Sequence, residues 1–297
     1  MFGQPSPHLA RYDASALVFV PLQLAAPALT DHFVRSDGLR FRVIDEGQRH
    51  RPALVLLHAI TTRSEVWQAQ ARLLRQHYRV VRMDYRGHGL SAAPDQGYAF
   101  ADLAADVAAV TRRLGLRRFV LIGLSFGGMI AQAFATRYPQ RLTGLVLCGT
   151  ASEWTQAERA MWQARLATLA EQGIEALAQP ALDRWLSPAY QRNHPRETKT
   201  VRRYVIDTGT RVFLRCGEAI LGLNLTRALR RLRLPSLVLV GEHDPGTPPR
   251  KSRQIARSLA GSRLVVVRDA WHFPQMERPV AVNAALRRFL ARIHRAA

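Results

Sequence analysis

The chain has 297 residues, of which 47% are hydrophobic and 22% are charged. This composition is typical of one large or two small globular domains, and it excludes disordered, collagen-like and coiled-coil proteins. Cys148 and Cys216 lie far apart in the sequence with no histidine or cysteine at ligand spacing, so we predict neither a disulfide framework nor a metal site. A chain of this length can bury enough surface to fold by itself, and we expect no cofactor.

Arginine dominates the charge of the chain. There are 43 Lys+Arg against 22 Asp+Glu, a formal net charge of +21. Such a balance suggests nucleic-acid binding, because basic contacts to phosphates dominate that kind of affinity. However, only Lys199 and Lys251 are lysines, and the arginines are spread through every segment. We therefore predict no nucleic-acid partner, but a solvated basic surface that attracts anionic ligands.

The first 29 residues differ from the rest of the chain. Residues 14–29 are apolar, and Ala26-Pro27-Ala28 resembles the cleavage site of a secretory signal. Pro21 and Gln23 interrupt the apolar stretch, so we favour a poorly ordered N-terminal extension at 1–29, or a mis-called start, over a signal. No segment contains the roughly 20 apolar residues that a membrane span requires. We expect a cytoplasmic protein without a membrane partner, since its two cysteines suit a reducing compartment.

From Thr30 onward, short apolar runs alternate with amphipathic stretches, a pattern typical of an α/β fold with a mostly parallel sheet. Residues 32–46 alternate around Asp37-Gly38, which predicts a hairpin. The apolar runs predict strands at residues 53–57, 80–83, 119–122, 145–147, 236–240 and 263–267. Helical spacing predicts helices at residues 100–114, 129–138 and 280–293.

The middle of the chain has no convincing strand pattern. Helical spacing appears at residues 157–172 and 217–223. We expect the helices here to be broken at three prolines: Pro180, Pro188 and Pro195. The organisation predicted is a helical cap of residues 152–226, inserted after the sixth strand of a core that comprises residues 30–151 and 227–297.

A candidate nucleophile lies between a predicted strand and a predicted helix. Residues 123–128 read Gly-Leu-Ser-Phe-Gly-Gly, a G-x-S-x-G sequence in the context of a nucleophile elbow. The glycines permit a tight turn where a side chain would collide with neighbouring backbone, and the turn raises Ser125 above the sheet. The N-terminus of the following helix would stabilise negative charge that develops there.

A serine hydroxyl needs a base, and the base needs an orienting acid. In this strand-turn-helix context the acid and the histidine are expected later in the chain, in that order. Asp244 follows the strand ending at Val240, and Glu242 is the alternative acid. His272 follows the next strand, so the predicted catalytic set is Ser125, Asp244 and His272.

An acyl-transfer site also needs donors for the oxyanion. The backbone N–H of Phe126, next after the nucleophile, is one candidate. The loop after the third strand supplies the other, for which we predict the Ile60 N–H, with Ala59 as the second choice.

Several segments of the chain are similar to the α/β-hydrolase superfamily and, within it, to the 3-oxoadipate enol-lactonases. The similarity extends from about residue 31 to residue 290, through the predicted cap. The segments are LLHAI at residues 56–60, MDYRGHGLSAAP at 83–94, GLSFGGMIAQ at 123–132, LVLCGTAS at 145–152, LVGEHDPGTPP at 239–249 and WHFPQMERP at 271–279.

This resemblance implies an α/β-hydrolase fold and a cofactor-free lactonase that opens an unsaturated lactone bearing a carboxylate. Ser125, Asp244 and His272 match the nucleophile, acid and base of the family. The resemblance also implies that Trp162 lines the pocket under the cap, and Arg165 is our candidate for the cation that faces an anionic substrate.

The chain departs from the enol-lactonase pattern near the expected pocket. Residues 58–61 are His-Ala-Ile-Thr where that family has an Asn-Ser-Leu-Gly-like segment. Val212-Phe213 replaces Gly-Tyr, and Trp271 replaces a small residue before the histidine. We therefore count Ala59 and Trp271 among the candidate substrate-binding residues.

The predicted function is hydrolysis of a small-molecule ester or lactone through an acyl-enzyme. A general carboxylesterase and a carbon–carbon bond hydrolase share the catalytic set and stay open as alternatives, and the related haloperoxidase-like proteins share it too. The alternative that is not an enzyme is a ligand-binding protein on a hydrolase scaffold. Ser125 excludes a haloalkane dehalogenase, which needs a carboxylate there. A homo-oligomer is compatible with the sequence, which does not determine the oligomeric state.

Overall fold

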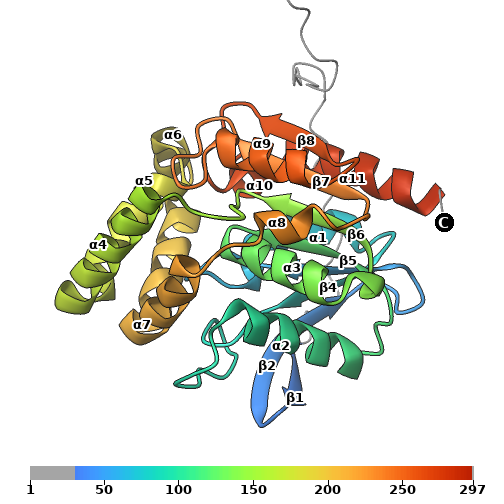
Figure 1. Ribbon diagram of the computed structural model, residues 1–297, viewed down its shortest axis with the longest axis horizontal. Helices are drawn as coiled ribbons and strands as arrows, with labels where there is room; N and C mark the ends of the chain where they lie inside the picture. Colours follow the sequence, from blue (N-terminus) through green and yellow to red (C-terminus); the bar gives the residue numbers. More distant parts are fainter. Residues whose placement is uncertain (1–30, 296–297) are drawn as a thin grey trace, which may run out of the picture.

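An eight-stranded, mostly parallel sheet forms the centre of the computed structural model, which describes residues 31–295 (Figure 1). The strand order is β1-β2-β4-β3-β5-β6-β7-β8. The strands are β1 (Asp31–Ser36), β2 (Leu39–Glu46), β3 (Ala53–Leu57), β4 (Arg79–Met83), β5 (Phe119–Leu124), β6 (Leu142–Cys148), β7 (Ser236–Gly241) and β8 (Arg263–Val267). Only the β1–β2 and β2–β4 pairings are antiparallel. The predicted strands are therefore confirmed, whereas the extension predicted at 1–29 lies outside the described residues.

The hairpin at the start of the sheet follows from two residues. Asp37 and Gly38 both have positive φ, 50° and 76°, and they join β1 to β2 with Ser36 opposite Leu39. Two consecutive residues with positive φ are typical of a tight turn that matches the twist of its strands. The hairpin prediction is confirmed.

Helices cover both faces of the sheet. In Figure 1, α2, α3 and α9 lie on one face, and α1 and α11 lie on the other. The helices of the core, on both faces together, are η1 (Ser64–Trp67), α1 (Gln68–Leu74), α2 (Phe100–Arg113), α3 (Phe126–Arg137), η2 (Pro139–Arg141), α8 (Thr226–Leu229), α9 (Pro249–Ser258), α10 (Pro274–Glu277) and α11 (Pro279–Arg295). Because both faces are covered, every residue of β3, β4, β5 and β7 is buried, which explains the nearly continuous apolar sequences of β3, β5 and β7.

A group of helices follows the sixth strand and packs together beside the sheet (Figure 1). Its members are α4 (Gln156–Gln172), α5 (Ile174–Trp185), α6 (Pro188–Asn193) and α7 (Pro195–Leu221), and we call them the helical cap. The expectation that Pro180 breaks a helix is wrong, because it lies inside α5, whose buried Leu177 and Ala181 hold the helix together. Pro188 and Pro195 begin helices, where the missing N–H costs no hydrogen bond.

The longest cap helix, α7, has 27 residues and was only partly predicted. It is interrupted at Gly209, where φ is 75° and ψ is 160°. Glycine adopts this conformation without steric cost, so the two helical parts of α7 meet at a break there. Among the described residues, no helix is both long enough and apolar enough to cross a membrane.

Candidate active site

Ser125 lies at the turn between β5 and α3 in a strained backbone conformation. Its φ is 53° and its ψ is −115°, and its N–H donates to the Cys148 carbonyl at 2.8 Å. A Cβ atom on Gly123 would lie 2.3 Å from the Gly127 oxygen, and one on Gly127 would lie 2.4 Å from the His58 oxygen. Both glycines are therefore needed for the close approach of backbone that holds the serine in this turn.

Ser125, His272 and Asp244 form a continuous chain of hydrogen bonds. His272 Nε2 lies 2.9 Å from Ser125 Oγ, and His272 Nδ1 lies 2.7 Å from Asp244 Oδ2. All three side chains are buried. The structure thus brings together the three residues that the sequence analysis selected, which come from the ends of β5, β7 and β8.

The Asp244 carboxylate is held by its own turn as well as by the histidine. Oδ1 accepts from the N–H groups of Gly246 and Thr247 at 2.8 and 2.9 Å, and Oδ2 accepts from the Thr247 hydroxyl at 2.9 Å. Burial alone would raise the pKa of Asp244, but the neighbouring His272 and these hydrogen bonds outweigh it and lower the pKa below its ordinary value. Asp244 is therefore an ionised acceptor for the His272 Nδ1–H.

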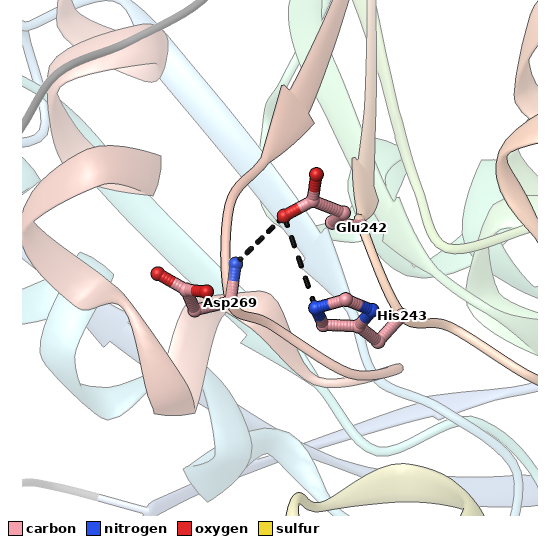
Figure 2. A group of neighbouring side chains, drawn as sticks. All are labelled: Glu242, His243 and Asp269. Atoms are coloured by element: carbon pink, nitrogen blue, oxygen red, sulfur yellow. Dashed lines mark hydrogen bonds and ion pairs between the residues drawn. The ribbon is translucent and has the colours of Figure 1, made fainter.

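Glu242, the alternative acid, lies outside this chain of hydrogen bonds. Figure 2 shows its carboxylate directed toward His243 and the backbone of Asp269. Glu242 Oε2 is 3.8 Å from His243 Nε2 and accepts from the Asp269 N–H at 3.2 Å. Possible metal-ligand atoms of these three side chains lie within 4.8 Å of one another, but all three residues are exposed. The geometry separates Asp244, which contacts His272, from Glu242, which does not.

The two candidate oxyanion donors are the N–H groups of Phe126, next to Ser125 in the sequence, and of Ile60. Phe126 begins α3, and Ile60 lies in the loop after β3; both residues line the same cavity as Ser125 and His272. Within residues 31–295, neither N–H has a hydrogen-bond acceptor. Buried N–H groups are nearly always paired in folded proteins, so two unpaired ones next to a serine are suited to an oxygen atom of a ligand.

The site opens into a cavity of about 180 Å³ between the sheet and the helical cap. Trp162 and Arg165, two of the predicted substrate-binding residues, line it. Ala59 and Trp271 do not: Ala59 is fully buried, and the Trp271 ring lies 4.9 Å from that of His243. Phe213, which the sequence analysis placed near the expected pocket, also lines the cavity, whereas the sequence analysis missed Trp154, Arg184, Trp185 and Thr247. Of these, Thr247 had a signal in the Asp-Pro-Gly-Thr turn. Trp154 lies in the segment before α4, and the others come from helices whose orientation the sequence does not reveal.

Two lining arginines have no carboxylate partner. Among the described residues, no hydrogen bond or ion pair joins Arg165 or Arg184 to an acidic side chain. The Arg165 guanidinium lies over the Trp162 ring, 4.6 Å from its centroid. Burial lowers the pKa of Arg165, and burial together with the charge of Arg165 lowers that of Arg184 to about 10. The protein thus holds two like charges in a partly buried place, which favours an anion between them.

A third arginine at the cavity wall is different. Arg250 lies 3.0 Å from Glu158, and Lys251 also forms an ion pair with Glu158. Burial would raise the pKa of Glu158, but its hydrogen bonds to Lys251, Thr155 and Arg250 lower it to about 2. This pair of contacts joins α4 to α9, and it gives Arg250 a carboxylate partner that Arg165 and Arg184 lack.

Comparison with known proteins agrees with this geometry. Residues 52–279 match the family model described as the alpha/beta hydrolase fold. The 3-oxoadipate enol-lactonase 2 of Acinetobacter baylyi is 29% identical over 248 residues, which are 84% of this chain and 92% of the relative.

Solved structures are similar over most of the chain as well. The enol-lactonase of Burkholderia xenovorans LB400 matches with a TM-score of 0.83 and 30% identity, covering 88% of this chain and 100% of that one. A thermophilic esterase of Thermogutta terrifontis, solved with malate bound, matches with a TM-score of 0.81 and 28% identity, covering 89% of this chain and 99% of that one.

Proposed function

Because the chain belongs to the α/β hydrolase fold family, we propose that it hydrolyses a small carboxylic ester or lactone through an acyl-enzyme on Ser125. The observation that carries this proposal is the chain of hydrogen bonds that joins Ser125, His272 and Asp244 at the wall of a cavity. An imidazole that contacts a serine hydroxyl on one side and an ionised carboxylate on the other is poised to remove the hydroxyl proton.

The reaction begins when His272 Nε2 accepts the proton of Ser125 and the serine oxygen attacks the substrate carbonyl. Asp244 stabilises the imidazolium that forms. The N–H groups of Phe126 and Ile60 donate to the oxygen that becomes negative. His272 then protonates the leaving oxygen, which in a lactone stays attached to the acyl group. Finally, His272 activates a water that releases the acyl group from Ser125.

Within this reaction class, we favour an enol-lactonase-like role over a general carboxylesterase. A relative and a structural neighbour are enol-lactonases. The cavity of about 180 Å³ is smaller than the roughly 300–1,000 Å³ typical of ligand pockets, which favours a compact substrate over a long-chain one. In this proposal the cap helices close the site over such a substrate, and the enzyme works in the cytoplasm as part of aromatic catabolism.

The unpaired arginines support a substrate that carries a carboxylate. An anion near Arg165 and Arg184 would offset both the desolvation of the two guanidinium groups and their mutual repulsion. Guanidinium groups suit this task because they bind carboxylates with two parallel hydrogen bonds. The esterase neighbour was solved with malate, a dicarboxylate, bound.

The test is hydrolysis of 3-oxoadipate enol-lactone and of p-nitrophenyl acetate by the purified chain, with Ser125→Ala as the control. Lactone opening that depends on Ser125 supports the enol-lactonase role. Activity on the neutral ester alone would support a serine hydrolase that acts as a general esterase and not as an enol-lactonase. Product analysis with a vinylogous diketone examines carbon–carbon bond hydrolysis. Absence of Ser125-dependent activity, with tight retention of a ligand, would favour a binding protein instead.

A second experiment separates charge recognition from chemistry. Arg165→Gln and Arg184→Gln should each raise KM for the anionic lactone by about 10-fold or more, since each removes a charged hydrogen-bond donor worth roughly 1.5–3 kcal/mol. The same variants should change KM for neutral p-nitrophenyl acetate by less than about 3-fold. Arg250→Gln is the matched comparison, because Arg250 is already paired with Glu158. Equal effects of the three variants would contradict anion binding by the Arg165–Arg184 pair.

A further inference from the structure

The loop that carries the Ile60 N–H contains a backbone strain that needs an explanation. Thr61 has a φ of 53°, in the left-handed region, although threonine is branched at Cβ and fits poorly there. Glycine adopts positive φ without cost, but threonine does not. In this chain other contacts must therefore hold the loop.

His88 supplies one of these contacts from the loop after β4. The Thr61 N–H donates to His88 Nε2 at 3.0 Å, and His88 Nδ1 lies 3.1 Å from the Arg86 carbonyl oxygen. The second contact assigns the proton to Nδ1, which leaves Nε2 as an acceptor. His88 is 1% exposed, and burial, aided by the neighbouring His58, lowers its pKa to about 3. Its imidazole is thus neutral, as an acceptor must be.

The peptide groups on both sides of the Ile60 Cα are fixed. On the N-terminal side, the Ala59 carbonyl accepts from His58 Nδ1 at 2.8 Å and from the Thr62 hydroxyl at 2.9 Å. The Ile60 N–H shares this rigid, planar peptide group, so its direction is set as well. On the C-terminal side, the Thr61 hydroxyl donates to the Ile60 carbonyl at 2.8 Å, and His88 holds the Thr61 N–H.

We infer that His88 is a positioning residue for the oxyanion hole: through the Thr61 N–H it holds the strained loop in the conformation that directs the Ile60 N–H toward the substrate oxygen. This inference rests on the proposed function. His88 touches neither Ser125 nor His272 in the hydrogen-bond network, so it acts only through the loop. An oxyanion donor matters most in the transition state, so the loss should appear in kcat rather than in KM.

The first experiment compares His88→Leu with His88→Gln, using p-nitrophenyl acetate. Leucine removes the acceptor, whereas the glutamine side-chain oxygen reaches the place of Nε2 and accepts the Thr61 N–H. Loss of one oxyanion donor typically lowers kcat by about 10²–10³-fold. We therefore expect His88→Leu to lower kcat by about 10- to 100-fold with KM within about 2-fold, and His88→Gln to stay within about 5-fold of wild type. Thermal unfolding establishes that both variants are folded, and His77→Leu, an exposed histidine, is the control.

Two further measurements distinguish positioning from general loosening. Inhibition by phenylboronic acid, which forms a tetrahedral adduct on the serine, should weaken in His88→Leu in proportion to kcat, because the adduct oxygen uses the same donors. In a Thr61→Gly background the effect of His88→Leu should shrink, since glycine adopts the positive φ without the strain that His88 offsets in threonine. Unchanged kcat in folded His88→Leu, equal losses in the two His88 variants, or an unchanged effect in the Thr61→Gly background would overturn the inference. Absence of Ser125-dependent activity in the wild type would instead contradict the proposed function.

Discussion

His272 Nε2 lies 2.9 Å from Ser125 Oγ, although 147 positions separate the two residues in the sequence. The contact exists because β5 and β8 are parallel members of one sheet, so that the residues following them emerge at the same edge. Ligand sites of open α/β sheets are typically found at this edge.

Replacement of the nucleophile should abolish turnover and leave the fold intact. We expect Ser125→Ala to lower kcat by at least about 10⁴-fold, because no other hydroxyl contacts His272 Nε2 among the described residues. The thermal unfolding midpoint should change by only a few degrees, since the hydroxyl makes no other hydrogen bond in residues 31–295. A variant that retains more than about 1% of wild-type kcat would show that the reaction does not require this serine.

The two neighbouring acids should differ sharply in their effects. Asp244→Asn keeps the shape of the turn but removes the charge that stabilises the imidazolium, and it should lower kcat by about 10⁴-fold. Glu242→Gln is the matched control: its carboxylate contacts His243 and the Asp269 backbone at the surface, so kcat should stay within about 2-fold. Steady-state kinetics with p-nitrophenyl acetate tests both, and a large loss in Glu242→Gln would reverse the assignment.

The ion pair between the cap and α9 should contribute to stability. Lys251 has a side chain only 5% exposed, and Glu158→Gln would leave it without its carboxylate. We expect the free energy of unfolding to fall by about 2 kcal/mol, because an unpaired, mostly buried charge is costly. Urea denaturation measures the loss. If Glu158→Gln were as stable as wild type, the cap would not depend on this contact.

Acid should destabilise the protein through two buried histidines. The pKa values of His58 and His88 are lowered from 6.5 to about 3, chiefly by burial. Between about pH 6.5 and pH 3 the unfolded chain binds protons that the folded protein does not, so the free energy of unfolding decreases as the pH falls. Near pH 4.5 each histidine should account for a loss of about 2–3 kcal/mol relative to pH 7.

The control for this effect is His88→Gln, which does not titrate in that window. Urea denaturation at pH 7 and at pH 4.5 should give a smaller pH-dependent loss in His88→Gln than in wild type. If the two proteins lost the same free energy, His88 would not be held neutral by the fold.

Much of the fold could be predicted because its signals are local. The hairpin at Asp37-Gly38 depends on two adjacent residues, and each core strand appears as one apolar run bounded by polar residues. The elbow around Ser125 needs only a strand, closely spaced glycines and a helix, all within consecutive residues. Where neighbouring contacts compensate a local rule, the prediction was wrong: Pro180 lies inside a helix whose buried face packs against α7.

The sequence by itself determined the strands, the elbow at Ser125 and the order in which Asp244 and His272 follow it, because each of these depends on nearby residues or on the edge at which a parallel strand ends. Only the tertiary structure decided that Asp244, and not Glu242, contacts His272, and that Arg184 lines the cavity while Trp271 does not. The same holds for the contact of Thr61 with His88. These relationships depend on the direction of each side chain and on which distant loops meet, and packing across the whole sheet and cap sets both.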